Sequence, residues 1–380
     1  MDEQNSHIFQ LFGVTEKSPE WNDWHWQYRN RIASAEELSY ILEMDEAEKE
    51  IVSACLSKFR MAVTPYYASL IAPHDSHDPI LMQAVPSVNE MNVFPWEMDD
   101  PLDEDGSSPV KNIVHRYPDR VLFLVTRCCA MYCRHCTRRR FVGEEDDPIT
   151  ADEIRNAISY IRETPEIRDV LISGGDPLML SDEQLDSILS ELRAIPHVDT
   201  IRIGTRVPVT MPMRITPELL SMLKKYHPIW INTHFNHPKE LTDSAIRACG
   251  QIVDTGIPLG NQSVLLKGIN DHTDTMKELL LKLIRARVRP YYLYQCDLSE
   301  GLEHFRADIR TGIKIIQDLT GNISGYAIPK FVIDAPGGGG KIPINPEYIV
   351  SMDDKSIVMR NYCGQIYEYP QPSGIDPGRR

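Results

Sequence analysis

The pattern of apolar and polar positions changes near residue 120. Beyond it, short apolar runs alternate with segments in which apolar residues recur every three to four positions, the spacing of a helix with one buried face. The runs are predicted strands, at Val121–Val125, Val170–Ser173, Thr200–Gly204, Ile229–His234, Leu259–Val264 and Pro290–Gln295. The periodic segments are predicted helices, at Ala151–Arg162, Ser181–Ile195, Pro217–Tyr226, Asp243–Val253, Thr273–Ala286 and Phe305–Leu319.

This succession of six strand–helix units predicts a parallel sheet, because strands that are apolar throughout are buried on both faces. We expect an α/β fold, a partial (βα)6 barrel of the TIM type with its chemistry at the C-terminal ends of the strands. A doubly wound open sheet is the competing arrangement. We divide the chain into a helical N-terminal region (1–110), the barrel (111–330) and a short C-terminal extension (331–380).

The N-terminal region has helical periodicity, but its sequence contains no motif that indicates a catalytic or binding function. Ala35–Ile41 and Asp45–Arg60 are predicted amphipathic helices, and a segment rich in tryptophan precedes them. Pro95–Val110 contains Asp, Pro, Gly and Ser and is interpreted as a linker.

Composition and charge exclude several classes of partner. The chain is 42% hydrophobic and 25% charged, typical of a globular protein, and its formal net charge is −15. A nucleic acid or an anionic membrane would require a basic face, so we expect neither. No apolar stretch is long enough to span a bilayer, and Met1–Ser18 lacks the features of a secretory signal. We therefore expect a cytoplasmic protein.

Four of the eight cysteines lie within positions 128–136, directly after the first predicted strand. Cys129, Cys133 and Cys136 form a CxxxCxxC pattern, and three thiolates can ligate three irons of a [4Fe–4S] cluster while the fourth iron stays open. A zinc knuckle is the alternative, but it needs a fourth ligand, for which His135 is poorly placed. Cys128 is expected to pack as a small hydrophobic residue.

This cysteine spacing after the first barrel strand is similar to that of the radical S-adenosylmethionine (SAM) superfamily. The resemblance implies that SAM binds the open iron and is cleaved to a 5′-deoxyadenosyl radical when the cluster supplies an electron. The next strand ends in Ser173, Gly174, Gly175 and Asp176, which resemble the superfamily's turn that meets the SAM amino group. Glycines at this turn would let backbone approach a ligand closely.

A second feature is the glycine run Gly337–Gly340, which is followed by Lys341. It is not a nucleotide-binding P-loop, because Ile342 stands where Ser or Thr is required. A lysine beside such an open loop can form a Schiff base with pyridoxal phosphate (PLP), and Arg116 and Arg120 can bind its phosphate. The alternatives are a flexible linker with an exposed lysine and a pair of surface arginines.

Taken together, these motifs resemble the lysine 2,3-aminomutase family over nearly the full chain. The stretches that carry the resemblance are Trp21–Trp26, Arg116–Arg120, Cys129–Arg140, Asn232–Pro238, Gly260–Val264, Tyr291–Asp297 and Asp334–Lys341. They are far more specific than the cysteine spacing, which the whole superfamily shares.

The resemblance implies a role for each matching residue. Cys129, Cys133 and Cys136 would ligate the cluster, and Lys341 would be the catalytic lysine that holds PLP. Arg116 and Arg120 would bind its phosphate, and Tyr117 would lie against its ring. Arg138 would pair with the substrate α-carboxylate, and Asp297 and Asp334 would receive the lysine ε-ammonium. His234, Gln262 and Tyr294 match positions that line the SAM and PLP pocket, with Tyr294 counted as catalytic.

The activity implied is conversion of L-α-lysine to L-β-lysine by an isomerase, through a SAM-initiated radical migration of the amino group. The resemblance also implies a [4Fe–4S] cluster, SAM, PLP, an external electron donor and a homo-oligomer. Alternatives within the family act on arginine, on glutamate, or on lysine destined for a translation factor. Two further alternatives lie outside the family, namely a radical enzyme that consumes SAM and a metal-binding protein without enzymatic activity.

Two of the proposed substrate-binding residues could instead have purely structural roles, and one feature of the family is missing from this sequence. Asp297 could bond local backbone at a strand end, and Asp334 could form the turn before the glycine loop. Some aminomutases carry a cysteine-rich C-terminal zinc site, but no cysteine follows Cys363 here and His272 stands where an earlier zinc cysteine is expected. We therefore predict no structural zinc.

Overall fold

The computed structural model describes residues 6–72, 74–143 and 149–372. Residues 1–5 of the predicted N-terminal region and residues 373–380 of the predicted C-terminal extension therefore lie outside it. Its main sheet has nine strands that follow one another in chain order. They are β1 (Ile113–Tyr117), β2 (Arg120–Thr126), β3 (Asp169–Gly174), β4 (Thr200–Gly204), β5 (Ile229–Thr233), β6 (Leu259–Leu265), β7 (Arg289–Gln295), β8 (Lys330–Ala335) and β9 (Gly340–Pro343). Because the order never reverses, the sheet is singly wound, and the doubly wound alternative is wrong.

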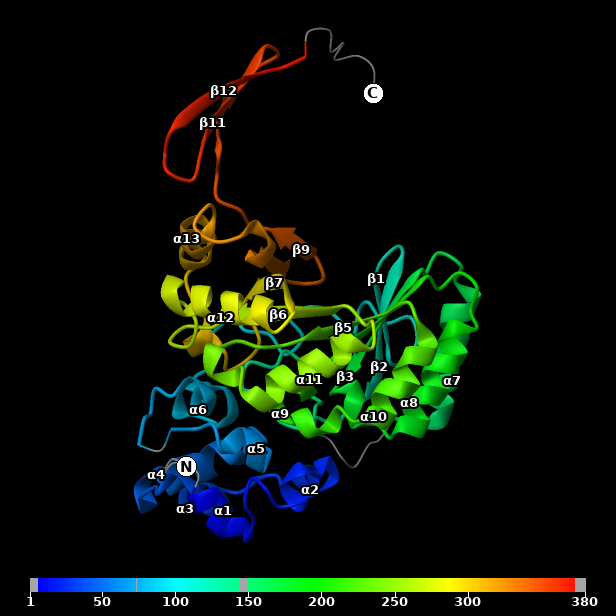
Figure 1. Ribbon diagram of the computed structural model, residues 1–380, viewed down its shortest axis with the longest axis vertical. Coiled ribbons are helices and arrows are strands. Elements are labelled where there is room, and N and C mark those ends of the chain that lie inside the picture. Colours follow the sequence, from blue (N-terminus) through cyan, green and yellow to red (C-terminus); the bar gives the residue numbers. More distant parts are fainter. Residues whose placement is uncertain (1–5, 73, 144–148, 373–380) are drawn as a thin grey trace.

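Strands β2 to β8 pair in parallel, and helices cover the outside of the curved sheet (Figure 1). The helices are α7 (Ala151–Glu163), α8 (Asp182–Arg193), α10 (Pro217–Leu223), α11 (Asp243–Asp254), α12 (Thr273–Arg285) and α13 (Ile309–Leu319). Side chains cap several of their N-termini; Ser181, for example, accepts from the backbone N–H of Gln184. The predicted partial barrel of six strand–helix units is confirmed.

The sequence did not predict the two edges of this sheet. β1 forms an antiparallel hairpin with β2, and β9 forms one with β8. The hydroxyl of Tyr117, at the end of β1, accepts a hydrogen bond of 2.9 Å from the backbone N–H of Lys341 on β9. The two edge hairpins therefore contact each other, which brings the ends of the sheet together into a nearly closed barrel.

The N-terminal region packs beneath the barrel (Figure 1) and shares its core. It contains α1 (Ser6–Phe12), α2 (Trp24–Arg29), α3 (Ala35–Leu42), α4 (Glu46–Leu56), α5 (Pro65–Ala68) and α6 (Pro79–Ala84). Ile32 and Tyr67 belong to the same buried hydrophobic cluster as Phe123 and Ile201 of the barrel strands. This shared core makes the N-terminal region an integral layer of the fold. Helix α4 ends at Leu56, four residues earlier than predicted.

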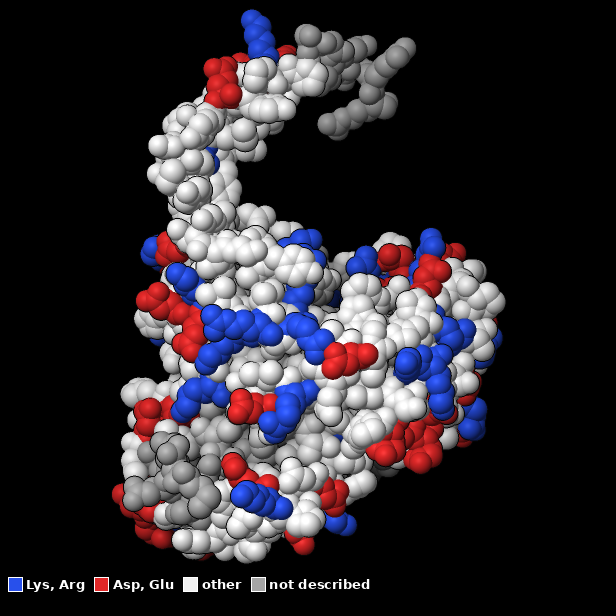
Figure 2. Space-filling model, in the orientation of Figure 1, with Lys and Arg blue, Asp and Glu red and all other residues white. Residues whose placement is uncertain are grey.

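After β9 the chain forms a separate antiparallel sheet of three strands, β10 (Ile349–Met352), β11 (Ser356–Arg360) and β12 (Ile366–Pro370). Figure 1 shows this sheet projecting away from the barrel, and Figure 2 shows few charged side chains on it. Most of its residues are exposed on both faces, including Ile349, Met352 and Tyr369. Among the helices of the described residues, none is long and apolar enough to cross a membrane.

Candidate active site

The three cysteines of the CxxxCxxC pattern lie in the loop that follows β2, at the C-terminal end of the barrel strands. Burial, then the Asp176 carboxylate, then the neighbouring Cys136, Cys133 and Cys128 raise the pKa of the Cys129 thiol well above its usual value. Burial also raises the pKa of Cys136 to about 11. Iron would therefore have to displace protons from these thiols on binding.

The N-terminal region holds this cysteine loop in place. Arg31 donates a hydrogen bond of 2.8 Å to the carbonyl of Cys129. The backbone N–H of Arg134, between two of the cysteines, donates to the carbonyl of Gln83 on α6 at 3.0 Å. The Arg134 guanidinium pairs with Glu90, whose side chain is fully buried. These contacts give the N-terminal layer a role that its sequence did not reveal.

The glycine turn after β3 packs directly on the same loop. The N–H of Gly175 donates to the carbonyl of Thr126 at 2.6 Å, and the N–H of Asp176 donates to the carbonyl of Cys128 at 2.7 Å. A Cβ on Gly174 would lie 2.3 Å from the Thr126 oxygen, and one on Gly175 would lie 2.2 Å from the Cys128 oxygen. The glycines thus allow two backbone segments to approach each other, whether or not a ligand also meets this turn.

Asp176 is occupied by contacts within the protein. Its carboxylate accepts from the hydroxyl of Thr205 at 2.7 Å and from the backbone N–H groups of Arg206 and Leu178. Burial raises its pKa, although these hydrogen bonds oppose the rise. Asp176 therefore links the turn after β3 to the segment after β4, and Ser173 lies on the same strand end, within 3.5 Å of Arg138.

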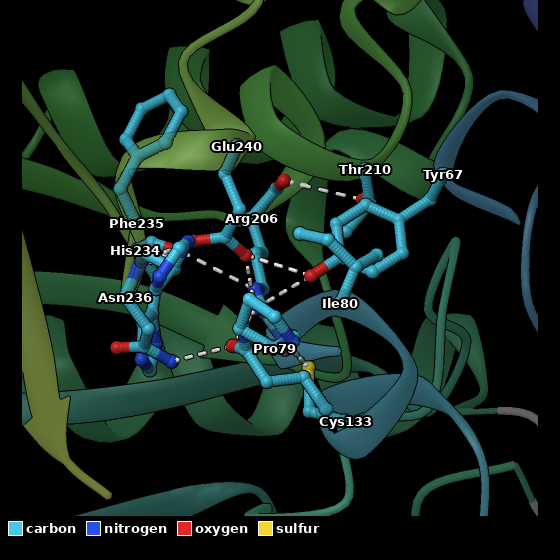
Figure 3. A network of polar contacts seen from close by, with 12 residues as sticks. Tyr67, Pro79, Ile80, Cys133, Arg206, Thr210, His234, Phe235, Asn236 and Glu240 are labelled. Carbon is cyan, nitrogen blue, oxygen red and sulfur yellow. Dashed lines mark hydrogen bonds and ion pairs between the residues drawn. The ribbon is translucent and has the colours of Figure 1, made fainter. Parts of the chain in front are cut away.

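His234 follows β5, and its carbonyl accepts from Arg206 in the polar network that also includes Cys133 (Figure 3). Its Nε2 is buried and has no hydrogen-bond partner among the described residues. Burial, with the Arg206 guanidinium nearby, lowers the pKa of His234 to about 3, so its ring is neutral. Gln262 lies half-buried on the neighbouring strand β6. A neutral imidazole with a free nitrogen fits a hydrogen bond to a ligand.

Lys341 lies opposite Asp334 in the β8–β9 hairpin, and its Nζ is 3.0 Å from the Asp334 carboxylate. The Tyr294 ring, on the neighbouring strand β7, has its centroid 5.3 Å from the same Nζ. Burial raises the pKa of the Tyr294 phenol well above its usual value, so the hydroxyl stays protonated. The hairpin therefore brings three of the predicted residues together beside the hydroxyl of Tyr117.

Asp297 follows β7 and lies half-buried among charged groups. Burial and, after it, the nearby Asp334 carboxylate raise the pKa of Asp297 to about 7, while Lys341 opposes the rise. Glu104 and Arg138 also act on it. The two carboxylates predicted to receive an ammonium group are thus close enough to repel each other, which favours a cation between them.

Arg138 is held by a residue that the sequence did not single out. Glu104 accepts from its Nε and Nη2 at 3.0 and 2.7 Å, and the two side chains are only 7% and 19% exposed, respectively. Burial alone would raise the pKa of Glu104, but Arg138 outweighs it and the pKa is lowered. The predicted linker is therefore part of the site.

Other residues of this segment contact the glycine loop and Arg116. The N–H of Gly337 donates to the carbonyl of Pro101 at 3.0 Å, and Arg116 donates to the carbonyl of Leu102. Nε of Arg116 is nevertheless buried without a partner among the described residues. Arg120 pairs with its neighbour Asp119 at 2.8 Å and lies over the Tyr117 ring, with its Cζ 5.0 Å from the centroid.

The residues present fit the three groups that the motifs imply. For a cluster, the loop offers three adjacent thiols, although within the described ranges no three His, Cys, Asp or Glu side chains are placed to bind a single metal ion. For PLP, Nε of Arg116, which has no partner in the described part of the chain, and the backbone of Gly338 beside it suit a phosphate, and Lys341 follows on β9. For SAM, the free nitrogen of His234 suits a polar ligand.

The structure brings most of the predicted residues together in two neighbouring groups, one around the thiols and one around Lys341, while Arg120 is exposed and pairs with Asp119. It adds residues that sequence reasoning missed, namely Glu104, Arg206, Glu240, Gln83 and Glu90. Their positions have no motif-like spacing, and they meet the site only through packing between distant segments.

Comparison with known proteins agrees with these observations. The model of a family described as lysine-2,3-aminomutase matches residues 316–379, and that of the radical SAM superfamily matches residues 123–280. An L-lysine 2,3-aminomutase of Clostridium subterminale is 56% identical over 94% of this chain and 86% of its own length. One of Bacillus subtilis is 51% identical over 94% and 76%. A glutamate 2,3-aminomutase of Clostridioides difficile is 43% identical over 99% and 88%.

Proposed function

This chain belongs to the lysine 2,3-aminomutase family of radical SAM enzymes, and from that membership we propose that it converts L-α-lysine to L-β-lysine. The observation that carries the choice of substrate is the pair of carboxylates, Asp297 and Asp334, at the PLP lysine. A half-buried acidic pair selects a cation, because two close carboxylates without a counter-charge are costly. A glutamate side chain would meet repulsion there.

The family uses a [4Fe–4S] cluster, SAM and PLP. When bound, these groups supply a carbon-centred radical and a carrier for the migrating nitrogen. Cys129, Cys133 and Cys136 would hold the cluster, with Ser173, the Gly174–Gly175 turn, His234 and Gln262 beside SAM. Lys341 would hold PLP, with Arg116 and Arg120 at its phosphate and Tyr117 against its ring.

The chain's own residues bind and orient the substrate in this scheme. Arg138 binds the α-carboxylate and the Asp297–Asp334 pair binds the ε-ammonium, so the site measures a basic amino acid from end to end. Burial keeps the Tyr294 hydroxyl protonated, which makes it a donor beside Lys341. Close positioning and exclusion of water favour a radical reaction. The hydrogen atom removed from Cβ returns at Cα once the amino group has migrated, so the product has the same atoms as the substrate.

The test is an anaerobic assay. Reconstituted protein is incubated with SAM, PLP, a chemical reductant and, in separate reactions, L-lysine, L-arginine or L-glutamate. We expect β-lysine from lysine alone, with SAM conserved. Cleavage of SAM without β-lysine would instead support a SAM-consuming enzyme, and β-glutamate would support the related activity.

The PLP assignment has its own test. Lys341→Ala is expected to abolish the absorbance that PLP acquires on binding, while the iron content of the protein stays the same. Lys355→Ala is the matched control, because Lys355 is an exposed lysine in the turn before β11. PLP absorbance that survives in Lys341→Ala would show that another residue holds the cofactor.

We also propose that the protein is cytoplasmic, takes its electron from an external donor, binds no nucleic acid, contains no structural zinc, and forms a homo-oligomer. The projecting sheet of β10–β12 supports the last point, because exposed Ile349, Met352 and Tyr369 favour burial against another surface. Light scattering on the full chain is expected to give a mass above 43.4 kDa. A monomer at micromolar concentration would contradict it.

A further inference from the structure

A buried arginine reaches from the barrel to one of the predicted cluster ligands. Arg206, between β4 and the short helix α9 (Val207–Thr210), donates from Nη1 to the sulfur of Cys133 at 2.8 Å (Figure 3). The same guanidinium donates from Nε to the carbonyl of His234 at 3.2 Å. The side chain is 9% exposed, so its charge is poorly screened by water.

This guanidinium is held in place by further acceptors. Nη2 donates to Glu240 Oε1 at 2.8 Å and to Gln83 Oε1 at 2.6 Å. Glu240 has no exposed side-chain surface, and its carboxylate also accepts from the Tyr67 hydroxyl at 2.7 Å and from the Asn236 N–H at 2.6 Å. Figure 3 shows Glu240 and Tyr67 beside Arg206, on the side away from Cys133. A side chain anchored in this way cannot turn away from the sulfur.

We propose that Arg206 is a positioning residue that sets the reduction potential of the cluster through its hydrogen bond to Cys133. The inference rests on the proposed function, because it requires a cluster on Cys129, Cys133 and Cys136. Reduction adds negative charge to a cluster, so a cationic donor at a ligand sulfur stabilises the reduced state and raises the potential. The hydrogen bond would make the cluster easier for the external donor to reduce.

Other charged groups nearby do not take the place of Arg206. Arg134 and Arg139 both pair with the carboxylate of Glu90. The rings of His135 and His234 lie 5.2 Å apart, and Nε2 of His135 is 3.3 Å from the side-chain nitrogen of Asn236. Glu240 partly offsets the charge of Arg206, but it accepts from Nη2, whereas Nη1 donates to Cys133. Arg206 alone among these groups donates directly to a thiol sulfur.

The first test is a redox titration of the anaerobically reconstituted full chain, followed by electron paramagnetic resonance of the reduced cluster. The variant is Arg206→Gln combined with Glu240→Gln, so that no unpaired carboxylate remains buried. We expect a lower midpoint potential than in the wild type at equal iron content. Arg202→Gln is the control, because Arg202 is a barrel arginine that pairs with Asp169. An unchanged potential at equal iron content would overturn the inference.

The second test does not depend on the folding of the double variant. Wild-type protein labelled with 15N in the arginine guanidinium groups is reduced and studied by pulsed electron paramagnetic resonance. We expect a coupling between a 15N nucleus and the cluster that is lost in Arg206→Lys labelled in the same way. A reduced cluster without such a coupling contradicts the role of Arg206. If Cys133→Ala retains the cluster unchanged, the ligand assignment fails instead.

Discussion

Glu104 binds one edge of the Arg138 guanidinium, and the other edge faces Ser173. Nε and Nη2 donate to the Glu104 carboxylate at 3.0 and 2.7 Å, whereas Nη1 makes a long hydrogen bond of 3.5 Å to the Ser173 hydroxyl. An arginine has five donors in a fixed plane, so a carboxylate on one edge orients the rest. Glu104 thereby orients Arg138 so that its remaining donors can bind a second carboxylate. We propose that this second carboxylate is the α-carboxylate of the substrate.

Replacing Glu104 by glutamine should weaken this orientation. A hydrogen bond to a charged group contributes about 1.5–3 kcal/mol, so we expect KM for lysine to rise roughly 10-fold or more and kcat to change less. Steady-state kinetics under anaerobic conditions measure both constants. Iron and PLP contents should match the wild type, and a KM equal to that of the wild type would show that Glu104 does not position Arg138.

Binding of lysine should depend on the ionisation of Asp297. The pKa of this carboxyl is raised to about 7, chiefly by burial and then by Asp334, so below pH 7 the free protein holds it protonated and neutral. We expect KM for lysine to rise as the pH falls through about 7. In Asp297→Asn, KM should be high at every pH and should lose this dependence.

The same raised pKa has a consequence for stability. An acid whose pKa is higher in the folded than in the unfolded state destabilises the fold as the pH rises from its usual value of 3.8 to about 7. Asp297→Asn should therefore gain stability relative to the wild type between pH 4 and pH 8. Thermal unfolding across this range measures the difference, and a gain that is independent of pH would argue against the raised pKa.

Gly175 should be intolerant of any side chain. A Cβ at this position would lie 2.2 Å from the carbonyl oxygen of Cys128, so Gly175→Ala must move the cysteine loop. We expect a loss of about 1–3 kcal/mol in stability and a clear loss of bound iron after reconstitution. Gly325→Ala is the control, because no atom lies within 4 Å of a Cβ added there. Normal iron content in Gly175→Ala would contradict the proposed coupling of the turn to the loop.

Glu90 should be essential for the junction between the N-terminal layer and the cysteine loop. It is fully buried and pairs with Arg134 and Arg139, so Glu90→Gln leaves these cations without their partner. We expect a loss of about 3–5 kcal/mol in the free energy of unfolding. Glu368→Gln, at an exposed position of β12, should unfold like the wild type.

The stabilisation by Glu90 should also depend on pH. Burial alone would raise its pKa, but Arg134 and Arg139 together lower it. A lowered pKa means that the contribution is complete above the unfolded-state value and is lost as the pH falls. The difference in stability between the wild type and Glu90→Gln should therefore shrink in acid. A difference that stays constant down to the acid transition would show that ionised Glu90 is not its source.

Structural and chemical features that depend only on a few neighbouring residues could be predicted from the sequence. The spacing of Cys129, Cys133 and Cys136 after a strand, and Lys341 after four glycines, identified the chemistry because the ligands of one loop are close along the chain. The alternation of strands and helices likewise determined the parallel sheet. The pairing of Arg138 with Asp297 and Asp334 came from family resemblance rather than from any local pattern.

Contacts between distant segments were decided only by the tertiary structure. Glu104 lies in a stretch that resembles a linker, and Arg206 has no neighbouring motif, yet one orients Arg138 and the other meets Cys133. The edge hairpins β1–β2 and β8–β9 also escaped prediction, since short strands at a sheet edge show little hydrophobic pattern. The local sequence thus determined which reactive groups the protein carries. Packing of remote segments decided which charges hold them, because those interactions exist only once the chain has folded.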